Sequence, residues 1–217
     1  MSAAPSAKLE LKLTFDEGKL RSELSSLSKV PEGERKALRR AINRALLGTR
    51  TDIVADMRRR VALKAGDIRK GIFVQTPWWK SHSHCDGYVR LASGPLALAK
   101  YDVRPLRQTA QKGKLPSQYR ALSYRLTRGG KLYDNTAVTD IPLVSKLFMI
   151  KGQKSGKFGV YFRLQGTKYV FPMQQSGPSL QFWFSRAADQ NRILAGAEVR
   201  FRKELSHQVA HLGGGGR

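Results

Sequence analysis

The residue types that bind metal ions crowd together at one place in the sequence, in the stretch "WWKSHSHCDG". They are His82, His84, Cys85 and Asp86. A structural zinc site draws four ligands, usually from two separated pairs, so that the chain can wrap around the ion. The second pair is missing near this stretch, and a polar exposed loop is the favoured interpretation. The sequence therefore predicts no metal and no cofactor.

The remaining two histidines offer the one alternative to that interpretation. His207 and His211 are four residues apart in a segment with helical spacing. Such a spacing places two imidazoles on one face of a helix. A zinc site shared between this pair and the pair at His82 and His84 would need the two segments to meet in the fold.

Catalysis on nucleic acids or esters would need clustered carboxylates for a divalent cation, or a nucleophile beside a base. Between residues 103 and 188 the only acids are Asp134 and Asp140. The chain contains no GxSxG, HExxH, Walker-type or dinucleotide-binding motif. The glycines of "GGKLYDNT" lack the strand-to-helix context that cradles a phosphate. We therefore expect a protein that is not an enzyme.

Charge is the most informative property of the composition. The 217 residues include 40 Lys or Arg against 16 Asp or Glu, for a net charge of +24. Such a surface repels itself unless an anionic partner offsets the charge. Nucleic acid is the favoured partner because each neutralised phosphate releases a counterion. An acidic protein partner, or a basic surface without a specific partner, is the alternative.

Two regions hold most of this charge. Residues 35–70 contain 12 basic and 3 acidic side chains, and residues 103–188 contain 15 basic and 2 acidic ones. Neither region has a compact helix-turn-helix pattern for reading bases, so we expect contacts with phosphates alone. The candidate polyanion-facing or DNA-facing residues are Arg39, Arg44, Arg58, Arg59, Lys112, Lys114, Arg125 and Arg128. Trp78 and Trp79 are candidates for a protein interface or for the core.

The strongest element among those that position these cations is a helix beginning after Pro31. Its apolar positions repeat every three to four residues, at Leu38, Ile42, Ala45, Leu46, Thr49, Ile53, Met57 and Val61. Glu32 and Glu34 near its start, and Arg58 to Arg60 near its end, suit the helix dipole. Gly48 lies in the middle, where glycine costs about 1 kcal/mol relative to alanine. It predicts a kink or a close contact with another helix.

The rest of the chain is predicted to form strands and a terminal helix. Period-two alternation predicts an opening strand at 7–15, and short helices are expected at 18–28 and 65–72. Strand-like runs occupy 71–76, 87–93, 96–103, 119–126, 157–164 and 168–173. Ile193, Ala197, Phe201, Leu205 and Val209 give residues 186–212 helical spacing.

These elements predict an α+β fold in which a long N-terminal helix and a C-terminal helix frame an antiparallel or mixed β-sheet or partial barrel. We expect a single domain over 1–217, with flexible tails at 1–6 and 213–217. We expect residues 112–135 to form a mobile basic loop or hairpin. No run of 18 apolar residues and no secretion signal is present, and the single cysteine fits a reducing compartment. We expect no contact with a membrane.

Several stretches in a fixed order resemble a known family. They are "KALRRAINRALLGTRTDIVADMRRRVALKAGDIRKGI", "SGPLALAKYDVRPLRQ", "IPLVSKLFMIKGQKSGKFGVYFRL", "YVFPMQQSGPSL" and the closing basic helix "RILAGAEVRFRKELSHQVAHL". Together they cover about 35–212 and resemble the minor tail protein Z, or tail completion, family of long-tailed bacteriophages and prophages. The segment 112–135 has no counterpart in that pattern.

The resemblance implies a virion structural protein that acts at the head-proximal end of the tail, in tail assembly and head–tail joining. Its implied partners are the tail terminator, the tail tube and the head–tail connector, with DNA in the channel beside it. A homo-oligomeric ring is implied, sixfold to match a tail tube, with assembly in the host cytoplasm. No catalytic residue comes with the family. The alternative from the residues alone is a sequence-nonspecific DNA-binding protein, such as a regulator or packaging factor.

Overall fold

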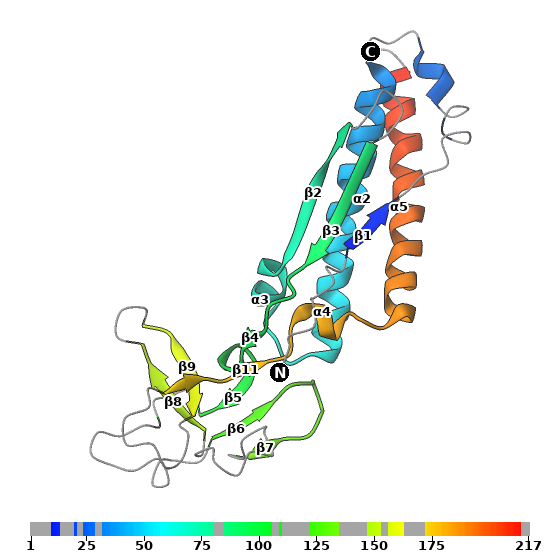
Figure 1. The fold of residues 1–217 in the computed structure, drawn as a ribbon. Coiled ribbons are helices and arrows are strands. Elements are labelled where there is room, and N and C mark those ends of the chain that lie inside the picture. The colour runs from blue at the N-terminus through cyan, green and yellow to red at the C-terminus, as the bar shows by residue number, and fades with distance from the viewer. Residues whose placement is uncertain are drawn as a thin grey trace, which may run out of the picture. The chain divides into compact units, whose positions relative to one another are not determined.

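The computed structural model describes residues 10–13, 20, 24–28, 32–79, 85–105, 109, 122–134, 147–152, 156–162 and 172–213. The chain has an α+β fold, with two long helices, α2 (Gly33–Arg60) and α5 (Ala187–Gly213), and several small antiparallel sheets (Figure 1). Its internal contacts divide it into two compact units. Unit 1 comprises residues 1–56, 69–93 and 181–217, and unit 2 comprises 57–68 and 94–180. The single domain expected from the sequence stays a prediction.

Helix α2 follows the predicted apolar repeat closely. Of the eight positions in that repeat, all but Leu38 are buried, and Leu38 is half-buried. Glu34 lies in the first turn and Arg58 to Arg60 in the last, as the helix dipole favours. The buried hydroxyl of Thr49 donates to the Ala45 carbonyl at 2.8 Å, so this polar side chain is satisfied inside the core.

In unit 1, α5 lies antiparallel beside α2 (Figure 1). Its buried positions include four of the five predicted ones, Ile193, Ala197, Phe201 and Leu205, whereas Val209 is half-buried. A Cβ atom at Gly48 would lie only 2.5 Å from Arg200 Cδ. The glycine in the middle of α2 is therefore the close helix contact that its position in the sequence predicted.

Ion pairs link α2 to α5 at three places among the described residues. Arg44 Nη1 lies 2.6 Å from Glu204 Oε1, and Arg200 Nη1 lies 2.8 Å from Asp52 Oδ2. Asp56 of α2 forms the third ion pair with Arg192 of α5. Each pair is partly exposed, so it contributes modestly to stability. Together the three pairs fix the register of the two helices and neutralise three of their arginines.

A three-stranded antiparallel sheet packs on α2 in unit 1. Its strands are β1 (Glu10–Leu13), β3 (Cys85–Leu91) and β2 (Ile72–Trp79), with β3 in the centre. Val89, Leu91 and Ile72 are buried. A Cβ atom at Gly87 would lie 2.7 Å from Leu46 Cδ1, so glycine permits the close approach of β3 to α2.

Smaller elements complete unit 1. The 3-10 helix η1 (Ser25–Leu27) falls within the helix expected at 18–28, much of which lies outside the described residues. Helix α3 (Ala65–Lys70) matches the predicted short helix and passes from unit 2 into unit 1. Helix α4 (Leu180–Trp183) precedes α5. Gly213, expected in the C-terminal tail, ends α5 instead.

The described residues of unit 2 form three small antiparallel sheets. One holds β8 (Phe148–Lys151), β9 (Phe158–Phe162) and β10 (Met173–Gln174); the second holds β4 (Leu96–Ala97) and β11 (Ser176–Gly177). The third holds β5 (Asp102–Arg104), β6 (Ser123–Arg125) and β7 (Tyr133–Asp134). The strands that the sequence predicts thus form several sheets, and no closed barrel is present among the described residues.

Two predicted segments of unit 2 take a more detailed form in the structure. The run 96–103 divides into β4, the 3-10 helix η2 (Leu98–Lys100) and β5, because the Tyr101 amide donates to the Leu98 carbonyl and closes a turn. The described part of 112–135 begins at residue 122 and forms a hairpin of β6 and β7. The N-terminal tail at 1–6 and residues 214–217 lie outside the described residues.

Candidate polyanion-binding site

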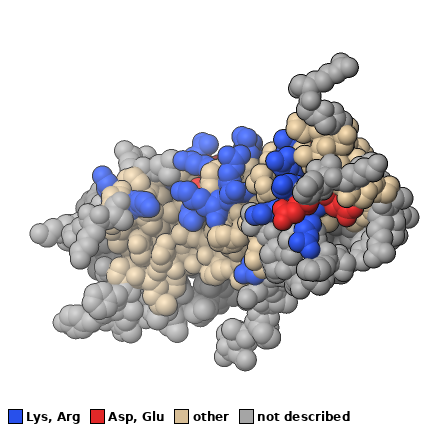
Figure 2. All heavy atoms as spheres, turned by 90° about the horizontal axis from the view of Figure 1, so that it is seen from above, with Lys and Arg blue, Asp and Glu red and all other residues tan. Residues whose placement is uncertain are grey.

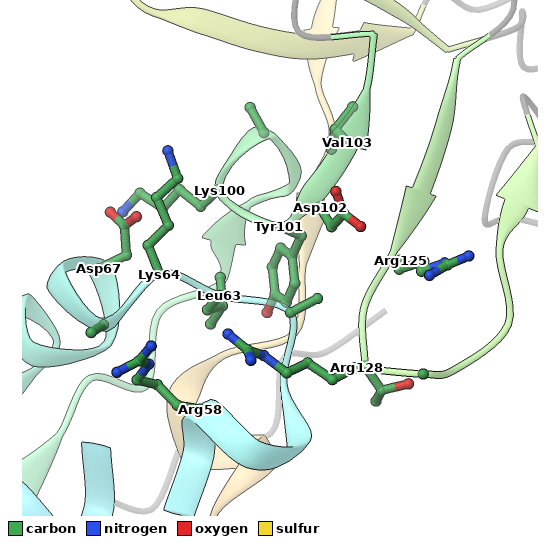
Figure 3. A pocket seen from close by; sticks show the side chains of 15 residues that line it. Arg58, Leu63, Lys64, Asp67, Lys100, Tyr101, Asp102, Val103, Arg125 and Arg128 are labelled. Carbon is green, nitrogen blue, oxygen red and sulfur yellow. The ribbon is translucent and has the colours of Figure 1, made fainter. Parts of the chain in front are cut away.

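A cationic pocket of about 680 Å³ lies entirely within unit 2 (Figure 3). It is lined by the end of α2, the segment that follows it, the start of α3, η2, β5, β6 and the turn after β6. The cations that line it are Arg58, Lys64, Lys100, Arg125 and Arg128, and the carboxylates are Asp67 and Asp102. Segments about 70 residues apart in the sequence thus contribute to one basic surface.

Backbone hydrogen bonds hold the end of α2 against the turn after β6. Val61 forms a β-bridge with Thr127, and the Ala62 amide donates to the Leu126 carbonyl at 3.0 Å. The Arg128 amide donates to the Arg60 carbonyl at 2.9 Å. Helix α2 therefore ends where its chain begins to pair as a strand, and this pairing brings Arg58 and Arg128 to the same pocket.

The turn that carries Arg128 depends on glycine. Gly129 has a φ of 67°, in the left-handed region that costs an L side chain about 1–2 kcal/mol. The Gly130 amide donates to the Thr127 carbonyl at 3.3 Å and closes the turn. The "TRGG" sequence thus directs the chain so that Arg128 stands at the tip of the hairpin.

Tyr101 forms an anchored wall of the pocket. Its side chain is buried, and its hydroxyl donates to the Pro178 carbonyl at 2.6 Å. A Cβ atom at Gly177 would lie 2.7 Å from the Tyr101 ring, so the glycine makes room for it. In Figure 3, Arg58 and Arg128 lie below Tyr101, while Arg125 lies apart from them on β6.

The cations of the pocket outnumber its carboxylates and are not neutralised by them. Asp102 is paired with Arg104, with 3.3 Å between Arg104 Nε and Asp102 Oδ1. Asp67 lies on the side of Lys64 and Lys100 (Figure 3). Within the described ranges of the chain, none of the five pocket cations forms an ion pair. Unpaired guanidinium groups facing one cavity favour an anionic ligand, above all a phosphate.

The hairpin behind the pocket is stiffened by two tyrosines. Tyr124 of β6 stacks on Tyr133 of β7, with 5.2 Å between ring centroids and 14° between ring planes. Burial raises the pKa of Tyr124 above its ordinary value, and the neighbouring Tyr133 raises it further. Tyr124 therefore remains a neutral core group through the physiological range of pH.

The structure places the predicted polyanion-facing residues in three settings. Arg58, Arg125 and Arg128 share the pocket, and Arg59 is exposed beside Arg58 on the last turn of α2. Arg39 and Arg44 are exposed on α2 in unit 1, where Arg44 is paired with Glu204. Lys112 and Lys114 lie outside the described residues.

The sequence did not single out Lys64 and Lys100 as members of this site. Lys64 falls inside the first basic region, but Lys100 falls in neither, and no local pattern connects it to Arg58. On the face in Figure 2, Lys and Arg form several groups, and the Asp and Glu that can be seen lie mainly in one place. This view agrees with a surface on which cations are in excess.

The other candidates are described only in part. Trp78 and Trp79 end β2, where their backbones pair with Asp86 and Cys85. Their side chains, together with His82 and His84, lie outside what the structure describes. His207 and His211 do share a face of α5, with 6.5 Å between ring centroids. In the described part of the chain, no three His, Cys, Asp or Glu side chains come together as a metal site would require.

Comparisons with known proteins give no relative for this chain: no family model, no curated protein and no solved structure matches it. No helix in the described ranges combines the length and the apolar run that crossing a bilayer requires.

Proposed function

We propose that this chain is a non-enzymatic structural protein of a bacteriophage virion, a minor tail protein that completes the head-proximal end of the tail and takes part in head–tail joining. The observation that carries the proposal is the cationic pocket of unit 2, in which five cations without ion pairs in the described structure face one cavity. DNA passing through the neck is a polyanion that this surface suits. The order of sequence motifs and the net charge of +24 support the assignment to a tail.

The proposal has consequences for assembly. The protein forms a homo-oligomeric ring, a hexamer where it meets a sixfold tail tube, and it contacts the tail terminator, the tail tube or the head–tail connector. Assembly takes place in the host cytoplasm and leaves the protein in the virion. Binding to phosphates without reading bases fits this role, because DNA of every sequence passes through the same channel.

Cryo-EM of intact particles assembled with a labelled copy of the chain tests the proposal. We expect the label as a ring at the junction of tail and head. Particles that carry the chain elsewhere, or not at all, would contradict the proposal. A companion measurement is the yield of joined particles when the chain is omitted, which we expect to fall while free heads and tails accumulate.

The same pocket also favours a second function, a free sequence-nonspecific DNA-binding protein that acts as a regulator or packaging factor. That function requires the isolated protein to bind duplex DNA at physiological salt, with an affinity that falls steeply as salt rises. Failure of the isolated protein to bind DNA would remove this alternative. The tail proposal would stand, because a ring presents many copies of a weak site.

A further inference from the structure

A second polar groove lies in unit 1, between α2 and α5. It has a volume of about 320 Å³ and is lined by Arg40, Asn43, Arg44, His207, Gln208 and His211. Every lining side chain is therefore polar. The groove shares no residue with the cationic pocket of unit 2, and all of its residues belong to unit 1.

One carboxylate organises the groove. Glu204, one turn before His207 on α5, accepts a hydrogen bond from Arg44 Nη1 at 2.6 Å and another from Gln208 Nε2 at 2.8 Å. Gln208 is buried, while Arg40, Arg44, His207 and His211 are exposed. Glu204 thus fixes two donors in place and leaves the outer cations of the groove open to solvent.

The groove combines two guanidinium groups with two imidazoles. Arg44 is paired with Glu204, whereas Arg40 forms no ion pair among the described residues and supplies a positive charge to the groove. His207 and His211 add ring N–H groups that can donate hydrogen bonds to a ligand.

The arrangement favours an anion over a metal ion. Two imidazoles at this spacing can bind a transition metal when they are neutral. The two guanidinium groups beside them, however, repel a cation. A tetrahedral oxyanion would instead accept hydrogen bonds from guanidinium, imidazole and the Asn43 amide together.

We propose that the groove between α2 and α5 is a phosphate-binding site formed by Arg40, Asn43, His207 and His211. The ligand is a phosphate group, either of a free polyphosphate or of a nucleic-acid backbone. The site does not depend on the tail assignment, because it uses none of the cations of the unit 2 pocket.

NMR of the imidazole signals tests this proposal in the full-length protein. Sodium pyrophosphate is titrated at constant pH, with ionic strength held constant by NaCl, and a short DNA duplex is titrated in parallel at equal phosphate concentration. We expect saturable shifts of the His207 and His211 signals. Stronger shifts with the duplex would identify DNA as the source of the phosphate, and stronger shifts with pyrophosphate would identify a free polyphosphate.

Matched variants separate the groove from the general basicity of the chain. Arg40→Gln removes a charge that lines the groove, whereas Lys203→Gln removes an exposed charge of α5 that does not line it. We expect R40Q to weaken pyrophosphate binding several-fold and K203Q to leave it unchanged. The double variant H207Q/H211Q should also weaken pyrophosphate binding several-fold. Equal effects of R40Q and K203Q, or no saturable shift with either probe, would overturn the proposal.

Discussion

The two units of this protein handle positive charge in opposite ways. Unit 2 contains 19 Lys or Arg against 4 Asp or Glu, and unit 1 contains 21 against 12. In unit 1, arginines of the two long helices pair with Asp52, Asp56, Glu198 and Glu204. In unit 2, the pocket cations lack such partners in the described part of the chain. Unit 2, which holds the cationic pocket, thus has both the larger net charge, +15 (19 − 4) against +9 (21 − 12), and fewer carboxylates to pair with its cations.

Arginine side chains also play different parts in the two units. In unit 1, Arg44, Arg192 and Arg200 link α2 to α5 through ion pairs that neutralise their charges. In unit 2 the like charges of Arg58 and Arg128 are held near each other by backbone pairing, which costs free energy until an anion binds.

The largest expected effect concerns the core that the paired helices build. Phe201→Ala removes a buried ring from α5 and should lower the free energy of unfolding by about 3–5 kcal/mol. Urea unfolding followed by circular dichroism measures it. We expect one transition, as a single domain predicts, because the continuous helix α2 contributes residues to both units. Two separate transitions, of which only one responds to the substitution, would show that the units unfold independently.

Two double variants compare the pocket cations of unit 2 with the ion-paired cations of unit 1. Arg58→Gln with Arg128→Gln removes two unpaired pocket cations, and Arg192→Gln with Arg202→Gln removes two ion-paired cations of α5. For the first pair we expect affinity for duplex DNA to fall about tenfold or more, and the slope of log K against log salt to decrease by about 2. The second pair should change both quantities much less. Fluorescence anisotropy over a series of salt concentrations measures them, and equal losses for the two pairs would mean that only total charge matters.

A smaller effect should follow from straining the turn that presents Arg128. Gly129→Ala places an L side chain at a φ of 67°, where no neighbouring atom lies within 4 Å of the new Cβ, so backbone strain is the only cost. We expect a loss of about 1 kcal/mol in stability. Gly66→Ala is a matched control, because its Cβ also meets open space and its φ is not in the left-handed region. Equal stabilities of the two variants in urea would contradict the requirement for glycine at the turn.

The smallest effect concerns alkaline pH. Because the pKa of Tyr124 is raised in the folded protein, unfolding releases the Tyr124 proton once pH exceeds the ordinary value near 10. The stabilisation is complete below that value and is lost as pH rises through the raised pKa. Stability should therefore decline above about pH 10, and less steeply in Tyr124→Phe. Urea unfolding between pH 8 and pH 11 measures the difference, and identical slopes for the two proteins would contradict it.

The sequence by itself determined the features that depend on local periodicity and on composition. The repeat from Ile42 to Met57 fixed the buried face of α2, since residues three and four apart share a face of a helix. Gly48 predicted a kink or a close helix contact, and the structure shows the contact, because a Cβ atom there would meet Arg200. The excess of cations and the α+β class also followed from the chain alone.

The tertiary structure decided which cations lie together and which are neutralised. Lys100 joins Arg58 because Val61 pairs with Thr127 and Tyr101 is anchored at Pro178, and both contacts link residues far apart in the sequence. Arg44 is paired because folding brings it beside Glu204, 160 residues away in the chain, whereas Arg128 has no such partner among the described residues. Neighbours brought together by folding set the electrostatic environment of each charge, and no local pattern in the sequence encodes them.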